Sequence, residues 1–160
     1  MARWRGDRLA LALSASALAA WMQAQRAEYI TDRIRSGDDE AAATRNADAS
    51  YEKYFPGGAL APGHDVLVIL DGERPVGTIW LGPHPSDLDG VFWVWDVQVD
   101  AAERGRGVGR AAMLLAEEHV TSRGGIALAL NVFGFNTAAR GLYESLGYET
   151  TAVQMRKELG

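Results

Sequence analysis

A glycine-rich turn flanked by arginines is the part of this sequence best suited to chemistry. Residues 104–109 read Arg-Gly-Arg-Gly-Val-Gly and lie between a strand-like run, 91–100, and a helix-like run, 110–120. Three glycines leave the backbone N–H groups of such a turn uncovered, and the positive end of the helix dipole adds to their attraction for anions. The side chains of Arg104, Arg106 and Arg110 add positive charge. The turn therefore predicts a diphosphate site and a nucleotide-derived cofactor.

A second motif follows downstream, where residues 136–148 read NTAARGLYESLGY. Each motif alone is weakly specific, because glycine-rich turns are common. Together, and in this order, they resemble the GNAT superfamily of acyl-CoA-dependent N-acyltransferases. That family carries an (Arg/Gln)-x-x-Gly-x-(Gly/Ala) turn, and then Asn-x-x-Ala-x-x-Leu-Tyr-x-x-x-Gly-(Phe/Tyr). The resemblance extends over residues 65–158.

The resemblance implies a fold, a cofactor and a set of binding residues. The fold class would be α/β (α+β), one domain over residues 1–160, with a central mixed, mostly antiparallel sheet and helices on both faces. The fourth and fifth strands would splay apart, and acetyl-CoA would bind in the gap along exposed main chain. The cofactor-binding residues would be Val97, Gln98 and Val99 in the fourth strand, Arg104, Gly105, Arg106, Gly107, Val108, Gly109 and Arg110 in the turn, and Asn131, Asn136, Ala139 and Tyr143 beyond it.

Acetyl transfer from a thioester to an amine needs a proton donor for the departing thiolate. Tyr143 lies seven residues after Asn136 and so on the same face of the expected helix. In the family that this chain resembles, this tyrosine is the usual acid. The alternative is a tyrosine that only packs on an amphipathic helix.

Asp96 is the candidate base that would accept the proton of the attacking amine. In the strand-like run the alternation of side chains puts Asp96 and Gln98 on one face and Val97 and Val99 on the other. Burying a carboxylate here is costly without a purpose or a partner. Loss of this carboxylate is expected to weaken activity most at low pH, where the amine is hardest to deprotonate. The alternative is that Asp96 forms a structural ion pair. Water, Glu28 or Asp32 would then serve as the base.

Composition limits the class of protein. The formal net charge of the 160 residues is −5, which argues against a nucleic-acid partner. The absence of cysteine excludes disulfides and thiol catalysis, and three scattered histidines argue against a metal site. No apolar run approaches the ~20 residues of a membrane span. We expect a cytoplasmic protein with acetyl-CoA as co-substrate, no metal, and a small-molecule or peptide amine as acceptor; a homodimer is compatible with this.

The pattern of apolar residues and breakers predicts the elements that position these motifs. Residues 9–22, preceded by basic residues, imitate a signal peptide. Because this run continues directly into a helical pattern, we interpret it as a first strand and helix and not as a signal peptide. The expected helices are 16–35, 40–54, 107–123 and 136–146, and the expected strands are 8–13, 66–70, 76–81, 91–99, 126–132 and 148–155.

These features together predict an acetyl-CoA-dependent N-acetyltransferase that works by direct attack in a ternary complex. The alternative is a regulatory module of the same fold that binds acyl-CoA without catalysis. Tyr143 and the intact glycine turn favour the enzyme.

Overall fold

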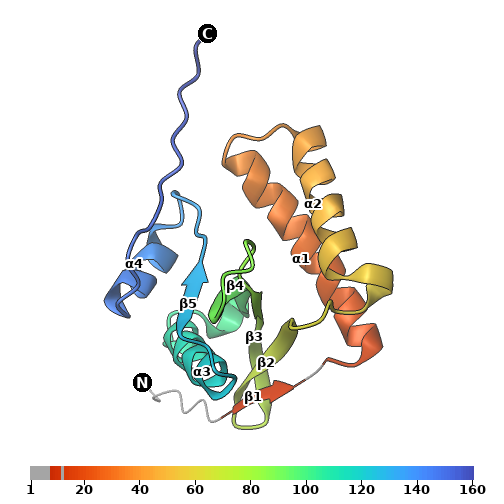
Figure 1. The fold of residues 1–160 in the computed structure, drawn as a ribbon, viewed down its shortest axis with the longest axis vertical. Helices are drawn as coiled ribbons and strands as arrows, with labels where there is room; N and C mark the ends of the chain where they lie inside the picture. Colours follow the sequence, from red (N-terminus) through yellow and green to blue (C-terminus); the bar gives the residue numbers. More distant parts are fainter. Residues whose placement is uncertain (1–7, 12) are drawn as a thin grey trace.

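A computed structural model describes residues 8–11 and 13–160 of the chain (Figure 1). The strands are β1 (Arg8–Leu11), β2 (Asp65–Asp71), β3 (Arg74–Pro83), β4 (Val91–Val99) and β5 (Ala127–Leu130), and the helices are α1 (Ala15–Arg35), α2 (Glu40–Tyr54), α3 (Val108–Ser122) and α4 (Thr137–Ser145). A short 3₁₀ turn, Pro56–Gly58, follows α2, and a second one, Ala101–Glu103, precedes the glycine-rich turn.

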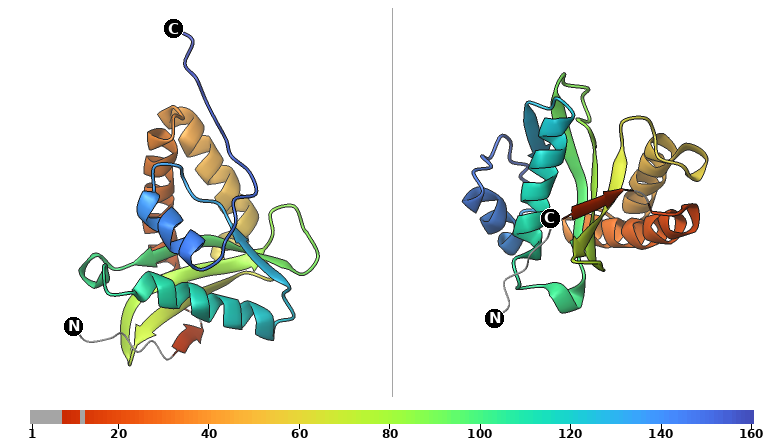
Figure 2. Two further views of the ribbon diagram at one scale, coloured as in Figure 1. Left: turned by 90° about the vertical axis from the view of Figure 1, so that its left-hand side faces the viewer. Right: turned by 90° about the horizontal axis from the view of Figure 1, so that it is seen from below.

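The strands form one mixed sheet in the order β1-β2-β3-β4-β5. The first four pair antiparallel, and β5 pairs parallel to β4. Helices α1 and α2 cover one face of the sheet, and α3 and α4 cover the other (Figures 1 and 2). This arrangement confirms the fold class that the sequence predicted.

Capping side chains fix where the helices begin. Ser14 accepts a hydrogen bond from the backbone of Ala17 at 3.2 Å and starts α1, and Asp39 accepts one from Ala42 at 2.7 Å and starts α2. The ambiguous amino-terminal run therefore forms strand β1 and helix α1. No helix among the described residues has the length and apolar composition to cross a bilayer.

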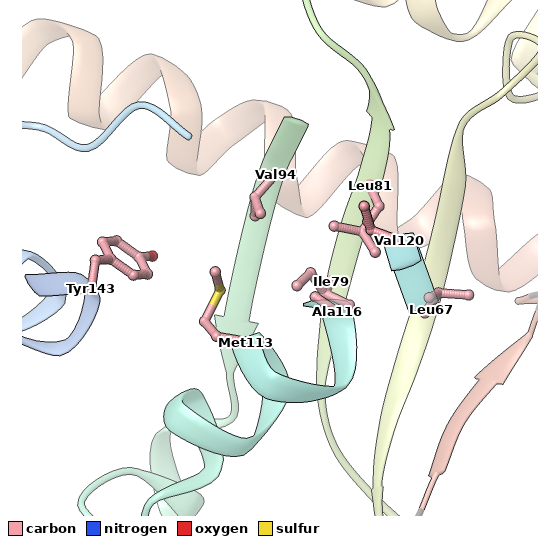
Figure 3. Close-up of a cluster of buried hydrophobic side chains, with 8 residues drawn as sticks. All are labelled: Leu67, Ile79, Leu81, Val94, Met113, Ala116, Val120 and Tyr143. Atoms are coloured by element: carbon pink, nitrogen blue, oxygen red, sulfur yellow. The ribbon is translucent and has the colours of Figure 1, made fainter. Parts of the chain in front are cut away.

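Three apolar clusters of the described residues hold the layers together, and the smallest consists of Ile69, Val76, Val108 and Ala112. The two larger ones lie on opposite faces of the sheet. One fills the space between the sheet and α3 and includes Leu67, Ile79, Val94, Met113 and Tyr143 (Figure 3). The other, on the α1 and α2 face, is aromatic and is built on Trp21, Phe55, Val66 and Trp80. Burial of these side chains stabilises the fold, at roughly 1.5–3 kcal/mol for each large apolar side chain.

Strands β4 and β5 separate along their length. Their pairing runs from Val91 with Ala127 to Val94 with Leu130 and stops there, while β4 continues to Val99. Beyond Val94 the edge of β4 that faces β5 is therefore free of strand partners. This divergence confirms the splayed fourth and fifth strands, and it opens the space in which the site lies.

The expected strand at 148–155 is wrong for this structure. After α4 the chain stays extended, without a partner strand among the described residues, and residues 149–160 are all exposed. A strand requires hydrogen bonds from a neighbouring strand. The β-branched residues Thr150, Thr151 and Val153 favour an extended backbone, but they cannot supply the partner.

Candidate active site

One cleft joins the glycine-rich turn to the splayed strands. Its volume is about 360 Å³, and it opens between β4, the start of α3 and helix α4. The residues that line it are Val97, Val99, Glu103, Arg104, Gly105, Gly107, Val108, Gly109, Met113, Asn136, Ala138, Ala139, Leu142 and Tyr143. Most of the residues expected to bind the cofactor are thus on one continuous surface.

The backbone of the turn has the form that an anion cradle requires. Gly105 and Gly107 have φ of 74° and 85°, a left-handed conformation that favours glycine. A Cβ atom added at either glycine would meet no heavy atom within 4 Å, so their cleft side is open. Gly107 is the N-cap of α3, and among the described residues no side chain hydrogen-bonds to the cap. The first N–H groups of α3 are therefore available to an anion, which fits a diphosphate.

Gly107→Asp is expected to abolish the thermal stabilisation that CoA gives to the protein. In the unsubstituted protein, CoA at a hundred times its dissociation constant should add about 2.7 kcal/mol. The substitution places a side chain and a negative charge beside the diphosphate, so binding should be lost in calorimetry.

Gly124→Asp is the matched control for backbone strain. Gly124 also has a positive φ, 80°, and open space around its Cβ position, but it follows the other end of α3. This variant should keep the CoA-dependent shift. Equal CoA affinity in Gly107→Asp and the unsubstituted protein would show that the turn is not the cradle.

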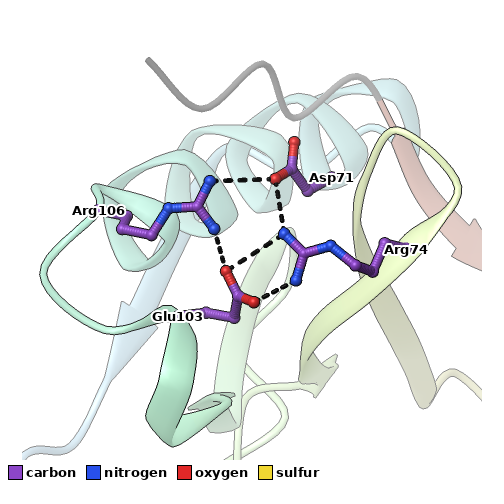
Figure 4. A network of polar contacts seen from close by, with 4 residues as sticks. All are labelled: Asp71, Arg74, Glu103 and Arg106. Carbon is purple, nitrogen blue, oxygen red and sulfur yellow. Dashed lines mark hydrogen bonds and ion pairs between the residues drawn. The ribbon is translucent and has the colours of Figure 1, made fainter. Parts of the chain in front are cut away.

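Arg106 is committed to a charge network instead of the cleft. It pairs with Glu103 and, at 3.3 Å, with Asp71, and Arg74 bridges the same two carboxylates (Figure 4). The hydrogen bond from Arg74 holds the pKa of Glu103 below its ordinary value. This network ties the β2–β3 hairpin to the turn, and the two arginines neutralise the one carboxylate that lines the cleft.

Three further residues expected at the cofactor have side chains outside the cleft lining. The side chain of Gln98 donates to Glu28 of α1 at 2.6 Å, on the opposite face of the sheet, while its main chain, which was the expected cofactor contact, stays in the stretch of β4 that does not pair with β5. Arg110 donates to Ser145 of α4 at 2.5 Å and so joins the two helices beside the cleft. Asn131 is exposed beyond the end of β5 and is not part of the lining. Arg104 does line the cleft, and its Nε donates to the carbonyl of Val99 at 3.2 Å.

Helix α4 presents Asn136 and Tyr143 to the cleft. The side chain of Asn136 accepts from the backbone of Ala139 at 3.2 Å, so it caps the helix and lines the cleft at once. The ring of Tyr143 points from α4 toward β4 and Met113 and is only 9% exposed (Figure 3). Burial raises the pKa of Tyr143, and the negative charge of Asp96 raises it further. The phenol therefore keeps its proton at neutral pH.

A bulge in β4 sets the position of Asp96. Asp96 pairs with Trp80 and Val94 pairs with Leu81, so Trp95 is an extra residue without a partner on β3. Trp95 packs with the aromatic cluster under α1 and α2, while Val97 packs toward α3. Asp96 lies between these layers, next to the point where β4 and β5 part.

Asp96 is held in an environment that favours its neutral form. Burial raises the pKa of Asp96 to about 7, and the negative charges of Glu28 and Asp32 on α1 contribute to the shift. Its Oδ2 atom is buried and has no hydrogen-bond partner among the described residues. A carboxyl group with a pKa near 7 can take up and release a proton at neutral pH, which is the property required of a general base.

Asp96→Asn is expected to stabilise the protein above pH 7. The pKa of the carboxyl is about 7 when folded and near 3.8 when unfolded, so the native state binds more protons between these values. Stability therefore falls as the pH rises through this window, by an amount on the order of 2–4 kcal/mol when complete. The gain from asparagine should be large at pH 8 and absent at pH 4 in thermal unfolding. A gain independent of pH would contradict the raised pKa.

Some lining residues were not expected from the sequence. Ala138 and Leu142 flank the expected positions on α4, and Met113 lies one helical turn beyond Gly109 on α3. Helical spacing from Ala139 and Gly109 would have found Leu142 and Met113. No local signal marks Glu103 as a lining residue, because its place depends on an ion pair with the distant Arg74 as well as on the nearby Arg106.

Comparison with known proteins identifies relatives that are acetyltransferases. The acetyltransferase (GNAT) family model matches residues 16–148. An uncharacterized N-acetyltransferase of Bacillus subtilis, YdgE, is 31% identical over 134 residues, which are 82% of this chain and 85% of that protein. Mycothiol acetyltransferase of Corynebacterium glutamicum is 36% identical over 84 residues, 52% of this chain but 28% of that protein.

A solved structure shows the same fold over nearly the whole chain. The crystal structure of YycN from Bacillus subtilis superposes with a TM-score of 0.86 and 23% identity, covering 95% of this chain and 98% of that one. At this identity the likeness concerns the fold, while the family model and YdgE concern the sequence. The family model and the likeness to YdgE show that the chain belongs to the GNAT acetyltransferase family.

Proposed function

We propose that this protein transfers an acetyl group from acetyl-CoA directly to an amine, with both substrates bound at once. The observation that carries the proposal is the single cleft that runs from the glycine-rich turn to Tyr143. Members of the GNAT family use acetyl-CoA, and this cleft offers an anion cradle at one end and a buried proton donor at the other.

On the cofactor side, the turn at 104–109 and the first N–H groups of α3 would bind the diphosphate. The free edge of β4 beyond Val94 would offer main-chain groups to the pantetheine arm, in the manner of an added strand. Val97, Val99 and Leu142 give this stretch of the cleft apolar walls. These contacts would bring the thioester to Tyr143.

Tyr143 would act as general acid. Its raised pKa keeps the phenol protonated, and the residue is mostly buried where it lines the cleft. As the carbon–nitrogen bond forms and the carbon–sulfur bond breaks, Tyr143 would donate its proton to the departing thiolate. General acid catalysis of this kind contributes ~10²–10⁴-fold to a rate.

Asp96 would receive the proton that the amine loses. The cleft lies on the α3 and α4 side, whereas Glu28 and Asp32, which act on Asp96, come from α1. Negative charge on the α1 side favours a cationic acceptor, and the proton of its amine would pass to the buried, unpartnered Oδ2 of Asp96 directly or through water. Transfer of one proton to this carboxylate gives the neutral amine that can attack the thioester.

Acetyl-CoA turnover against a panel of amines tests the proposal, with release of free thiol as the readout. The panel should include polyamines, amino sugars, lysine and peptides with free amino termini. We expect thiol release that depends on an amine and an equal amount of acetylated product by mass spectrometry. CoA binding without transfer to any amine would instead favour the regulatory module.

A further inference from the structure

Glu103 places a carboxylate in the wall of the cleft that is to receive a diphosphate. It ends the 3₁₀ turn just before the glycine-rich turn, and only 8% of the residue is exposed. A carboxylate so close to a bound diphosphate repels it, and the repulsion is strong where little water screens the charges. Tight binding of an anion here therefore requires that other groups offset this charge.

Two arginines offset the charge of Glu103, and one of them comes from outside the cleft. Arg106 follows Glu103 by three residues, whereas Arg74 begins β3 and reaches across from the β2–β3 hairpin (Figure 4). Arg74 donates to Glu103 through both Nη1 and Nη2, and its Nη2 also donates to Asp71 at 3.1 Å. A planar guanidinium suits this double contact with a carboxylate. Arg74 itself does not line the cleft.

The charges of this network cancel only because Arg74 is present. Two arginines face two carboxylates, Asp71 and Glu103, so the four groups sum to zero. Without Arg74, one positive charge on Arg106 would face two negative charges, and the network would carry a net negative charge beside the cleft. That charge would offset Arg104, which lines the cleft and attracts anions. The hairpin residue thus sets the balance of charge around the glycine-rich turn.

We propose that Arg74 is a positioning residue of the cofactor site, which holds Glu103 in a neutralised pair and so lets the turn at 104–109 bind the diphosphate of CoA. The inference rests on the proposed function, because it takes the cleft to be the CoA site. Arg74 acts through Glu103 from outside the lining. Its effect should therefore appear in the Kd of CoA and in the KM for acetyl-CoA instead of in kcat.

Calorimetry of CoA binding at low salt tests this role. Arg74→Gln should raise the Kd of CoA by roughly tenfold, and the effect should shrink as added salt screens the charges. Arg74→Gln/Glu103→Gln also removes the carboxylate and should return the Kd to near its original value. Arg123→Gln is the matched control, because it breaks an arginine–aspartate pair of 2.5 Å at the other end of α3 and changes the net charge equally. This control should leave the Kd unchanged.

Glu103→Gln alone separates compensation of charge from simple support of the fold. It removes the same ion pair as Arg74→Gln but leaves both arginines, so CoA should bind at least as tightly as to the unsubstituted protein. Equal weakening by Glu103→Gln and Arg74→Gln would overturn the role of Arg74, and so would an unchanged Kd in Arg74→Gln; either result leaves the CoA cleft in place. No binding of CoA to the unsubstituted protein would instead overturn the proposed function, and this inference with it.

Discussion

Tyr143→Phe is expected to lower kcat by about 10²–10⁴-fold, the usual contribution of a general acid. The affinity for acetyl-CoA should change little, because the phenyl ring still fills its place between α4, Met113 and the sheet. Only the proton donor is removed. Steady-state kinetics with a good acceptor, together with calorimetry of CoA binding, separates the two quantities.

Tyr148→Phe is the matched control for this substitution. Tyr148 contacts the ring of Tyr143, but its hydroxyl donates to Glu117 and does not line the cleft. Its loss should leave kcat within a small factor of the original value. Burial raises the pKa of Tyr143, so its phenol stays protonated up to at least pH 10, the ordinary pKa of tyrosine. Activity at lower pH should therefore show no decline caused by deprotonation of Tyr143. An unchanged kcat in Tyr143→Phe would reduce this residue to a packing role.

Asp96→Asn is expected to lower kcat/KM by about 10²–10⁴-fold at pH 8, as expected for loss of a general base. Asparagine preserves the volume and part of the hydrogen bonding, but it cannot accept the proton. The raised pKa of Asp96, about 7, reverses the pH dependence that an ordinary carboxylate would give. Below pH 7 the wild-type base is itself protonated, so the ratio of wild-type to variant activity should grow as the pH rises.

Changing the neighbours of Asp96 tests the cause of this pH dependence. Asp32→Asn removes a negative charge that helps to raise the pKa of Asp96, so the rising limb of the pH–rate profile should move to lower pH. Asp100→Asn removes an exposed carboxylate just after β4 and should leave the profile in place. If both variants give the original profile, the titrating group is not Asp96.

Local sequence chemistry determined a large part of this protein. The backbone at Gly105 and Gly107 is left-handed, a conformation that glycine adopts without the strain that a side chain would cause. Asn136 caps α4 as its side chain predicts, and the bounds of α2 and β4 match the expected ones. The spacing of Asn136, Ala139 and Tyr143 places all three on the cleft, because helical periodicity alone sets that face.

The tertiary structure decided what depends on contacts between distant segments. The side chain of Arg106 was expected at the cofactor, but partners that include the β2–β3 hairpin hold it outside the cleft lining, and Glu28 of α1 holds the side chain of Gln98 on the other face of the sheet. The pKa of Asp96 is raised by burial and by carboxylates on α1, which no local pattern around Asp96 reveals. Residues 148–155 were expected to form a strand, yet pairing requires a neighbour that the described part of the chain does not bring to them. Conformational preference is local, whereas ionisation and strand pairing depend on which groups the fold brings together.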